Sequence, residues 1–308
     1  MTRRTRGDVQ MRFGLVGTGP WAGIAHGPGL VACPVAELVG VWGRDPGKAA
    51  DLAGRLDTRP YADVDELFAD VDAVAFAVPP AIQSGLAIRA AQVGKHLLLD
   101  KPIALDVESA DALESTAAAA GVASVVFFTD RFVDTSRAWF DQVQGTLGWR
   151  GGWYRWLSTL QAPDNPFGGS AWRQAKGALW DTGPHALSTL IEALGPVAAI
   201  TATPGDGDLV TLVIRHESGA TSTVTLSQFA PPAAASFDCT LWGEAGLAPM
   251  PPRPDGAIVE VYAAAATDLV TAAGTGAPTR ADVRLGATIV RLIADAQAQI
   301  DRQRASAG

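Results

Sequence analysis

A histidine and an aspartate four positions apart form the first candidate for chemistry in this sequence. The segment KGALWDTGPH, which starts at Lys176, places Asp181 four residues before His185 and leads into the apolar run ALSTLIEAL. If a helix begins near Asp181, this spacing puts both side chains on one face, where a carboxylate can orient and polarise an imidazole. The pair then outlines an acid/base site. The alternative is an aspartate N-cap followed by a partly buried histidine on a core-facing turn.

A lysine at the end of a strand-like run is the second candidate. The segment HLLLDKP, from His96 to Pro102, delivers Asp100 and Lys101 directly after an apolar run. In open α/β sheets, ligands gather at the carboxyl ends of the strands. A lone lysine at a strand end is more often a surface charge, so a catalytic role for Lys101 depends on the other motifs.

A glycine-rich turn is the third candidate. It is the run GTGPWA of residues 17–22, which follows the strand-like FGLV and opens a helix. Gly17 permits a tight turn, Gly19 lets the backbone approach a pyrophosphate, and the small Ala22 allows close packing of helix on strand. An ordinary glycine turn is the alternative, although the order of strand, turn and helix favours a dinucleotide site. The cofactor-binding residues predicted here are Gly17, Thr18, Gly19, Pro20 and Trp21.

The end of the next strand-like run bears on the choice of cofactor. After ELVGVW the chain continues Gly43-Arg44-Asp45, near the position where a ribose-binding carboxylate is expected. Gly43 leaves room for a 2'-phosphate that Arg44 can contact, which favours NADP. In the alternative, Arg44 is a solvated turn residue, Asp45 binds the ribose hydroxyls, and the cofactor is NAD.

Arginines and aromatic residues supply candidate ligand contacts. Arg131, Arg155 and Arg173, which follows Trp172, are candidates for clamping substrate or cofactor phosphate, because arginine binds oxyanions in a fork. Surface or sheet-pairing roles remain open for Arg131 and Arg155. The nine tryptophans, several within residues 149–156, fit an aromatic floor for a sugar-like ring, core packing or a subunit interface equally well. The other histidines, interpreted as structural or surface residues, are His26, His96 and His216.

Short apolar runs alternate with helix-length segments in the first part of the chain. The runs FGLV, ELVGVW, AVAFAV, HLLL and SVVFF are separated by segments such as residues 46–56 and 107–120. This alternation is typical of βαβ units on a parallel sheet. We therefore expect an α/β Rossmann dinucleotide-binding domain over residues 11–129, preceded by a disordered N-terminal extension over residues 1–10 that is not a signal peptide.

The texture changes after residue 129. The segments WYRWLSTL, DLVTLVIRH and TSTVTLSQF alternate with a period of two and are joined by turn clusters, and residues 281–303 have a helical pattern. Residues 130–308 are predicted to form an α+β substrate-binding domain with a large open, mostly antiparallel sheet. An open sheet face commonly binds a second copy, so we expect a homodimer or homotetramer.

Composition excludes several classes of protein. The formal charge of −8 opposes nucleic-acid binding, which depends on clustered lysine and arginine. Only two cysteines occur, Cys33 and Cys239, and neither lies in a metal-binding pattern; no metal site is predicted and a reducing cytoplasm fits. The longest uncharged stretch, residues 115–129, is shorter than the ~20 apolar residues of a membrane span.

Taken together, the three motifs resemble those of the glucose-fructose oxidoreductase / inositol dehydrogenase / rhizopine catabolism (Gfo/Idh/MocA) family. That family carries GxGxxG/A, Glu-Lys-Pro and Gly-Gly-x-x-x-Asp-x-Gly-x-His in this order, and the likeness covers roughly residues 12–194. Asp100 replaces the usual Glu, and Ala178 interrupts the glycine run. Gln83 stands where the segment after Val78-Pro79 often carries His. The resemblance implies that Val78, Pro79, Gln83, Asp100, Lys101 and Arg173 also contact the cofactor.

The resemblance further implies catalytic roles for Lys101, Asp181 and His185 in an NAD(P)-dependent oxidoreductase acting on a sugar, polyol or related molecule. His185 is expected to be the general base, Lys101 to stabilise a developing alkoxide, and Asp181 to fix the imidazole or hold a neighbouring hydroxyl. Two alternatives remain open: an NAD-dependent glycoside hydrolase of the same fold, and a non-catalytic NAD(P)-sensing regulator.

Overall fold

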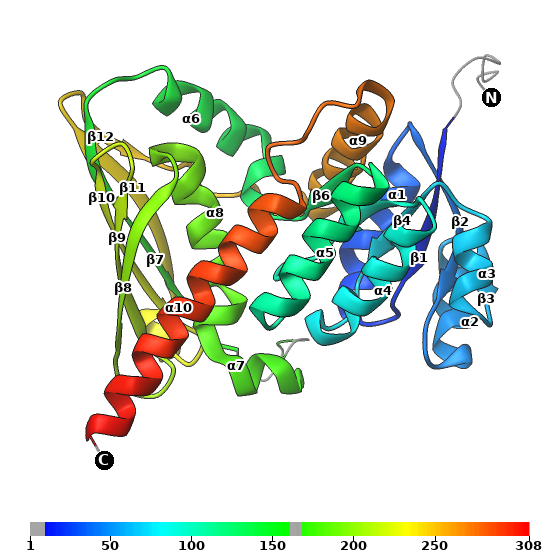
Figure 1. Ribbon diagram of the computed structural model, residues 1–308, viewed down its shortest axis with the longest axis horizontal. Coiled ribbons are helices and arrows are strands. Elements are labelled where there is room, and N and C mark those ends of the chain that lie inside the picture. Colours follow the sequence, from blue (N-terminus) through cyan, green and yellow to red (C-terminus); the bar gives the residue numbers. More distant parts are fainter. Residues whose placement is uncertain (1–9, 161–164, 166–167, 308) are drawn as a thin grey trace. The chain divides into compact units, whose positions relative to one another are not determined.

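The computed structural model describes residues 10–160, 165 and 168–307, which form two compact units (Figure 1). The first unit comprises the chain up to residue 104 together with residues 108–127 and 255–286. The second comprises residues 105–107, 128–254 and 287–308. Of the predicted extension over residues 1–10, all but Gln10 lies outside the described residues.

The first unit is built on a six-stranded parallel sheet with the strand order β3-β2-β1-β4-β5-β6. This order reverses direction between β1 and β4, as in the dinucleotide-binding fold, and it confirms the predicted Rossmann domain. The central strands read as nearly continuous apolar runs because helices cover both faces of such a sheet. The strands are β1 (Met11–Val16), β2 (Ala36–Trp42), β3 (Arg59–Tyr61), β4 (Ala73–Phe76), β5 (His96–Leu99) and β6 (Ser124–Val126).

The first unit also holds a helix from the far end of the chain. Helix α9 (Ile258–Thr275) packs on α1 (Gly27–Ala32) and beside β5 and β6, so residues 255–286 join the first unit. The predicted second domain, residues 130–308, thus includes a segment that lies in the first compact unit. The apolar positions of α9 find their partners on the earlier sheet, and a boundary drawn along the sequence misses such a return. The other helices are α2 (Pro46–Arg55), α3 (Val64–Ala69), α4 (Pro80–Gln92) and α5 (Val107–Ala120).

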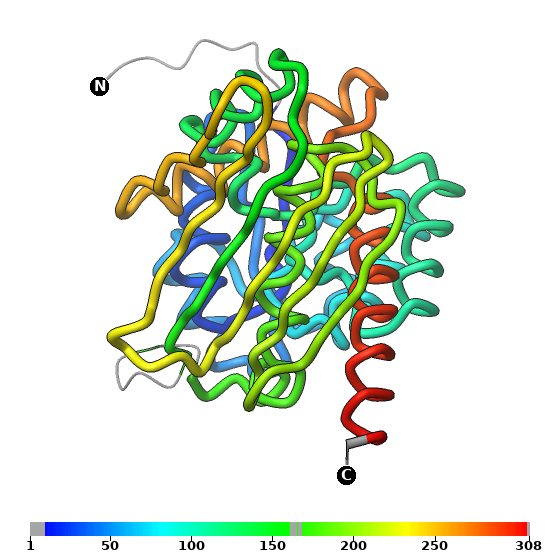
Figure 2. Tube along the Cα trace, turned by 90° about the vertical axis from the view of Figure 1, so that its left-hand side faces the viewer, coloured from blue at the N-terminus to red at the C-terminus, as the bar shows by residue number. Residues whose placement is uncertain are grey.

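The second unit contains a six-stranded mixed sheet, β12-β11-β7-β10-β9-β8. All neighbouring pairs are antiparallel except β7 with β10, so the predicted open, mostly antiparallel sheet is confirmed. One face is turned toward the viewer in Figure 2, and no described helix of this unit covers it. The strands are β7 (Trp149–Leu157), β8 (Val197–Pro204), β9 (Val210–His216), β10 (Thr221–Ser227), β11 (Ser236–Gly243) and β12 (Gly246–Pro249).

Helices cover the other face of this second sheet. The side chains of Gln299 and Gln303 bond the backbone of Ala202, which satisfies part of the edge strand β8. The helices are α6 (Asp134–Gln144), α7 (Ala171–Asp181), α8 (Gly183–Leu194) and α10 (Val283–Ala307), whose first residues belong to the first unit. Among the described residues, no helix is long and apolar enough to cross a membrane.

Candidate active site

The glycine turn lies at the carboxyl end of β1, where the strand order of the first sheet reverses. Gly17 has a φ of +126°, and a Cβ there would lie 2.3 Å from the carbonyl oxygen of Ala77, so only glycine fits. A Cβ at Gly19 would meet nothing within 4 Å. The backbone at Gly19 is therefore open to an approaching group, and Pro20 and Trp21 begin the helical run that continues through a π-helical turn, Ala22–His26, into α1. These residues fit a dinucleotide pyrophosphate.

The end of β2 lies against the same turn. A Cβ at Gly43 would lie 2.6 Å from Cγ2 of Thr18, so a larger residue here would force the Thr18 side chain to shift. Oδ1 of Asp45 accepts hydrogen bonds from the backbone N–H groups of Gly47 (3.0 Å) and Lys48 (3.1 Å) and thereby caps α2. Arg44 is exposed and makes no hydrogen bond or ion pair with a described residue.

The segment after β4 contains two residues near the glycine turn, Val78 and Pro79, and one buried residue that supports a neighbouring loop, Gln83. Val78 is half-buried, close to Gly17, and Pro79 is exposed. Gln83 is fully buried: its Nε2 donates to the carbonyl oxygen of Asp100 (2.7 Å), and its Oε1 accepts from the Asp100 N–H (2.8 Å). A cofactor contact of Gln83 stays a prediction. Because both ends of its amide are spent on the backbone, Gln83 holds the loop after β5 in place.

The loop after β5 carries Asp100 and Lys101. Oδ1 of Asp100 accepts the backbone N–H of Lys101 (2.7 Å), and both residues are half-buried at the carboxyl edge of the sheet. Beneath them lies His26, 1% exposed, whose Nε2 is 3.8 Å from Oδ2 of Asp100 and whose ring lies 4.3 Å from that of Tyr262. Burial lowers the pKa of His26 to about 4, while the charge of Asp100 opposes this shift. These contacts agree with a structural role for His26, which packs beneath this loop.

The Asp181 carboxylate lies in a buried polar cluster of the second unit. Its Oδ2 accepts hydrogen bonds from Nε of Arg173 (3.1 Å) and from Nε2 of Gln228. Asp208 braces the same region, because its carboxylate accepts the backbone N–H groups of Ala178 (3.2 Å) and Gln228 (2.8 Å). Arg173 therefore binds a site carboxylate. Gln228 and Asp208 lie far from the motifs in the sequence, and no spacing signal indicates them.

Asp181 and His185 come from two helices. Helix α7 ends at Asp181 and α8 begins at Gly183, whereas the sequence predicted a helix starting near Asp181. Gly177, with a φ of +66°, kinks α7 just before the site, while Nζ of Lys176 lies 5.0 Å from the ring centroid of Trp180 in the last turn. His185 is 6% exposed, and its ring lies 5.5 Å from the ring of Trp156 on β7.

The other arginines and histidines have structural environments. Arg131 is buried and donates to Ser188 and Glu192 of α8, whereas the exposed Arg155 is 3.9 Å from Asp238 on the open face of the sheet. The contacts of Arg155 favour the surface or sheet-pairing role, whereas Arg131 is buried against a helix and fits neither of these alternatives. His216 and His96 have structural environments, as predicted: His216 bonds Gly195 and Ser222, and His96 bonds Ala123.

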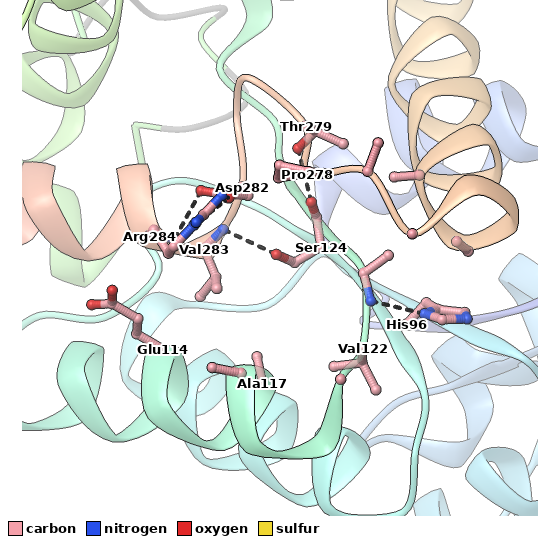
Figure 3. Close-up of a pocket in the computed structure, with 17 residues that line it drawn as sticks. His96, Glu114, Ala117, Val122, Ser124, Pro278, Thr279, Asp282, Val283 and Arg284 are labelled. Carbon is pink, nitrogen blue, oxygen red and sulfur yellow. Dashed lines mark hydrogen bonds and ion pairs between the residues drawn. The ribbon is translucent and has the colours of Figure 1, made fainter.

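A pocket of about 320 Å³ lies elsewhere in the first unit (Figure 3). Its walls come from β5, β6, α5 and the chain around residues 272–284, and many of its lining residues are small. Thr279 and the N–H of Val283 hydrogen-bond Ser124, and Arg284 pairs with Asp282 across its rim. His96 and Ser124 begin their strands, so this pocket lies at the amino ends of β5 and β6, opposite the edge that carries the glycine turn.

Two family models match the chain. Residues 11–128 match the model described as an oxidoreductase family with an NAD-binding Rossmann fold, and residues 150–248 match the GFO/IDH/MocA C-terminal domain. UDP-N-acetylglucosamine 3-dehydrogenase of Acidithiobacillus ferrooxidans is 38% identical over 105 residues, which are 34% of this chain and 33% of that protein. Inositol 2-dehydrogenase of Rhizobium meliloti is 32% identical over 125 residues, 40% of this chain and 38% of that protein. The matches thus span little more than a third of these relatives.

Solved structures resemble the whole fold. A levoglucosan dehydrogenase in complex with NADH and levoglucosan has a TM-score of 0.83 at 18% identity, covering 95% of this chain and 98% of that one. The UDP-N-acetylglucosamine 3-dehydrogenase of Acidithiobacillus ferrooxidans has a TM-score of 0.80 at 19% identity, covering 96% and 99%. At these identities the likeness shows the fold alone.

Proposed function

The chain belongs to the Gfo/Idh/MocA oxidoreductase family, and from this premise we propose that it is an NAD(P)-dependent dehydrogenase or reductase. Its substrate is a sugar, polyol or related small molecule, and the reacting group is a hydroxyl or carbonyl. The observation that carries the proposal is the open glycine turn at Gly19, on the edge of the sheet that also presents Lys101. When bound, a nicotinamide cofactor accepts or supplies the hydride in such a reaction.

The cofactor is held by the loops after β1, β2 and β4 in this proposal. The turn of residues 17–21 binds the pyrophosphate, and Val78 and Pro79 contact the adjoining part of the cofactor. NADP is preferred over NAD, because Gly43 carries no carboxylate and the exposed Arg44 can bind a 2'-phosphate. The N-cap bonds of Asp45 support this choice, since one of its oxygens is already engaged by α2.

Three side chains divide the catalytic work. His185 takes the hydroxyl proton during oxidation and returns it during reduction. Lys101 donates a hydrogen bond to the same oxygen and stabilises the negative charge that develops there. Asp181 orients the imidazole or holds a neighbouring hydroxyl, and the bonds from Arg173 and Gln228 support this role because they fix its carboxylate.

A cofactor titration with a turnover assay tests the function. Purified protein is titrated with NADPH and NADH while nicotinamide fluorescence is followed, and polyols and aldoses are then screened at 340 nm with the tighter cofactor. We expect tighter binding of NADPH and turnover of at least one neutral compound. Binding without any turnover favours a non-catalytic regulator, release of a sugar without net cofactor reduction favours a glycoside hydrolase, and no binding of either cofactor contradicts the proposal.

The open face of the second sheet is the proposed contact with a further copy of the chain. Trp242 (42% exposed) and Leu247 (67% exposed) are paired across β11 and β12 of this sheet, and Val213 (45% exposed) lies on β9. A homodimer or homotetramer covers these side chains, and sedimentation of Trp242→Lys compared with the parent chain tests it.

Free, buried Cys33 and Cys239 support a cytoplasmic location.

A further inference from the structure

An arginine outside the sequence motifs contacts the same tryptophan as the candidate catalytic histidine in the second unit. Trp156 connects the two: its ring is 5.5 Å from the ring of His185, and Cζ of Arg253 lies 5.3 Å from its centroid. Phe237, paired with Trp156 on β11, contacts the same ring edge-on at 6.0 Å and is 38% exposed. We call Trp156, Phe237 and Arg253 the aromatic–arginine wall.

Arg253 is held rigidly by a buried carboxylate. Its Nε and Nη2 donate to the two oxygens of Asp130, and the side chain of Asp130 is only 3% exposed. Such a two-point bond fixes the plane of a guanidinium. The two bonds use only part of the five N–H donors of an arginine, and Nη1 makes no hydrogen bond to a described residue. The side chain is 31% exposed, so donors remain for a ligand.

Charge balance decides what kind of ligand suits these donors. Asp130 offsets the charge of Arg253, and Asp181, four residues before His185 in the sequence, is likewise paired with Arg173. The wall thus offers hydrogen-bond donors and an aromatic surface without an uncompensated positive charge. A hydroxyl oxygen accepts such bonds at little desolvation cost, whereas a carboxylate or phosphate loses its hydration and meets a carboxylate already bound to Arg253.

We propose that Arg253, fixed by Asp130 beside Trp156, is a specificity-determining residue that binds hydroxyl groups of a neutral sugar or polyol ring lying against Trp156. The wall discriminates against rings that carry a carboxylate or phosphate at that position. This inference rests on the proposed function, because it assigns the substrate side of the same site.

Two substitutions test the two halves of the wall. Arg253→Gln removes the guanidinium, and we expect KM for myo-inositol and D-glucose to rise about 10- to 100-fold with little change in kcat, since a charged donor is lost from binding. Asp130→Asn leaves the charge of Arg253 without compensation. We expect it to shift the ratio of kcat/KM between D-glucose and the anions D-glucuronate and D-glucose 6-phosphate about tenfold toward the anions.

Controls separate specificity from folding. Arg253→Gln combined with Asp130→Asn replaces the ion pair by two amides, so it retains a neutral buried pair if either single variant is unstable. The matched control is Arg150→Gln, which breaks an exposed pair with Glu244 (3.1 Å) in the same unit and should change neither KM nor the substrate ratio. A purely structural role for Arg253 predicts loss of folded protein without any shift of the ratio.

Binding can be read without turnover. Saturation-transfer NMR on the full chain loaded with NADPH reports contact with the same four compounds, and we expect signals for the two neutral compounds that weaken in Arg253→Gln. Three results would contradict the proposed role of Arg253. They are a wild-type preference for the anions, no binding of either neutral compound, and an unchanged KM in a folded Arg253→Gln variant. Failure of NADPH and NADH to bind at all contradicts the proposed function instead, so the two failures are distinguishable.

Discussion

The carboxyl edge of the parallel sheet and the surroundings of His185 differ in how their arginines are paired. In the first region, a ligand can reach the open backbone at Gly19 and the exposed Arg44, which makes no hydrogen bond or ion pair with a described residue. In the second, Arg173 is paired with Asp181 and Arg253 with Asp130. The contrast suits a polyanionic cofactor on one side and an uncharged substrate on the other. Whether an arginine is already paired with a carboxylate therefore indicates the charge of the ligand that it can bind better than its presence alone does.

Replacement of His185 is expected to have the largest effect. His185→Asn removes the proposed proton acceptor, so kcat should fall by about 10²- to 10⁴-fold, the usual range for general acid–base catalysis, while the Kd of NADPH stays unchanged. Stopped-flow turnover and fluorescence titration measure the two quantities. His216→Gln, a change at a histidine bonded to Gly195 and Ser222, serves as the control. Near-normal kcat in His185→Asn would remove the histidine from the chemistry.

The first unit buries the neutral imidazole of His26, whereas the second buries ion pairs. Acid should therefore lower the stability of the folded chain through protonation of His26. The pKa of His26 is about 4 in the folded chain, lowered by burial from 6.5, so protonation favours unfolding. The contribution of His26 is fully present above about pH 6.5, and roughly 3 kcal/mol is lost as the pH falls toward 4.

Urea unfolding at pH 7 and pH 4 measures this loss. In His26→Phe, which keeps an aromatic ring beside Tyr262, the pH dependence should shrink by most of that amount. His96→Gln, at a less buried ring whose pKa is also lowered by burial, should remove less of it. Equal pH dependence in His26→Phe and the parent chain would show that His26 does not titrate as described.

Gly19→Ala probes the open backbone of the first region. The added methyl meets no protein atom within 4 Å, so thermal stability should hold while the Kd of NADPH rises about 10- to 100-fold through contact with the pyrophosphate. Gly17→Ala differs, because its Cβ would lie 2.3 Å from the Ala77 carbonyl oxygen, and it should lower stability as well. An unchanged Kd in Gly19→Ala would place the cofactor elsewhere.

Arg44→Ala is expected to have the smallest effect and the sharpest selectivity. Loss of an exposed guanidinium should raise the Kd of NADPH about tenfold and leave that of NADH nearly constant. Titrations at low and high salt measure both constants, since the NADPH effect should weaken as salt screens the phosphate. Equal changes for both cofactors would favour NAD and a role for Asp45 at the ribose.

Local signals predict the first region well and the second only in part. The GTGPWA turn, the apolar strands and the helix Val107–Ala120 follow from patterns within a few residues, and the structure agrees with them. Gln228, Asp208 and Arg253 reach the second site only after distant segments pair, so no spacing reveals them. Helix α9 escapes the linear domain boundary for the same reason, because its partners lie more than a hundred residues earlier in the chain.

Turnover of Lys101→Ala, measured together with its Kd for NADPH, tests whether this lysine takes part in the proposed dehydrogenase reaction. Lys101 lies on the cofactor-binding unit, yet its proposed role is to stabilise charge on the substrate oxygen. We expect Lys101→Ala to lose at least about 100-fold in kcat while its cofactor affinity stays within a few-fold of the parent chain. Near-normal turnover with intact cofactor binding would contradict this role.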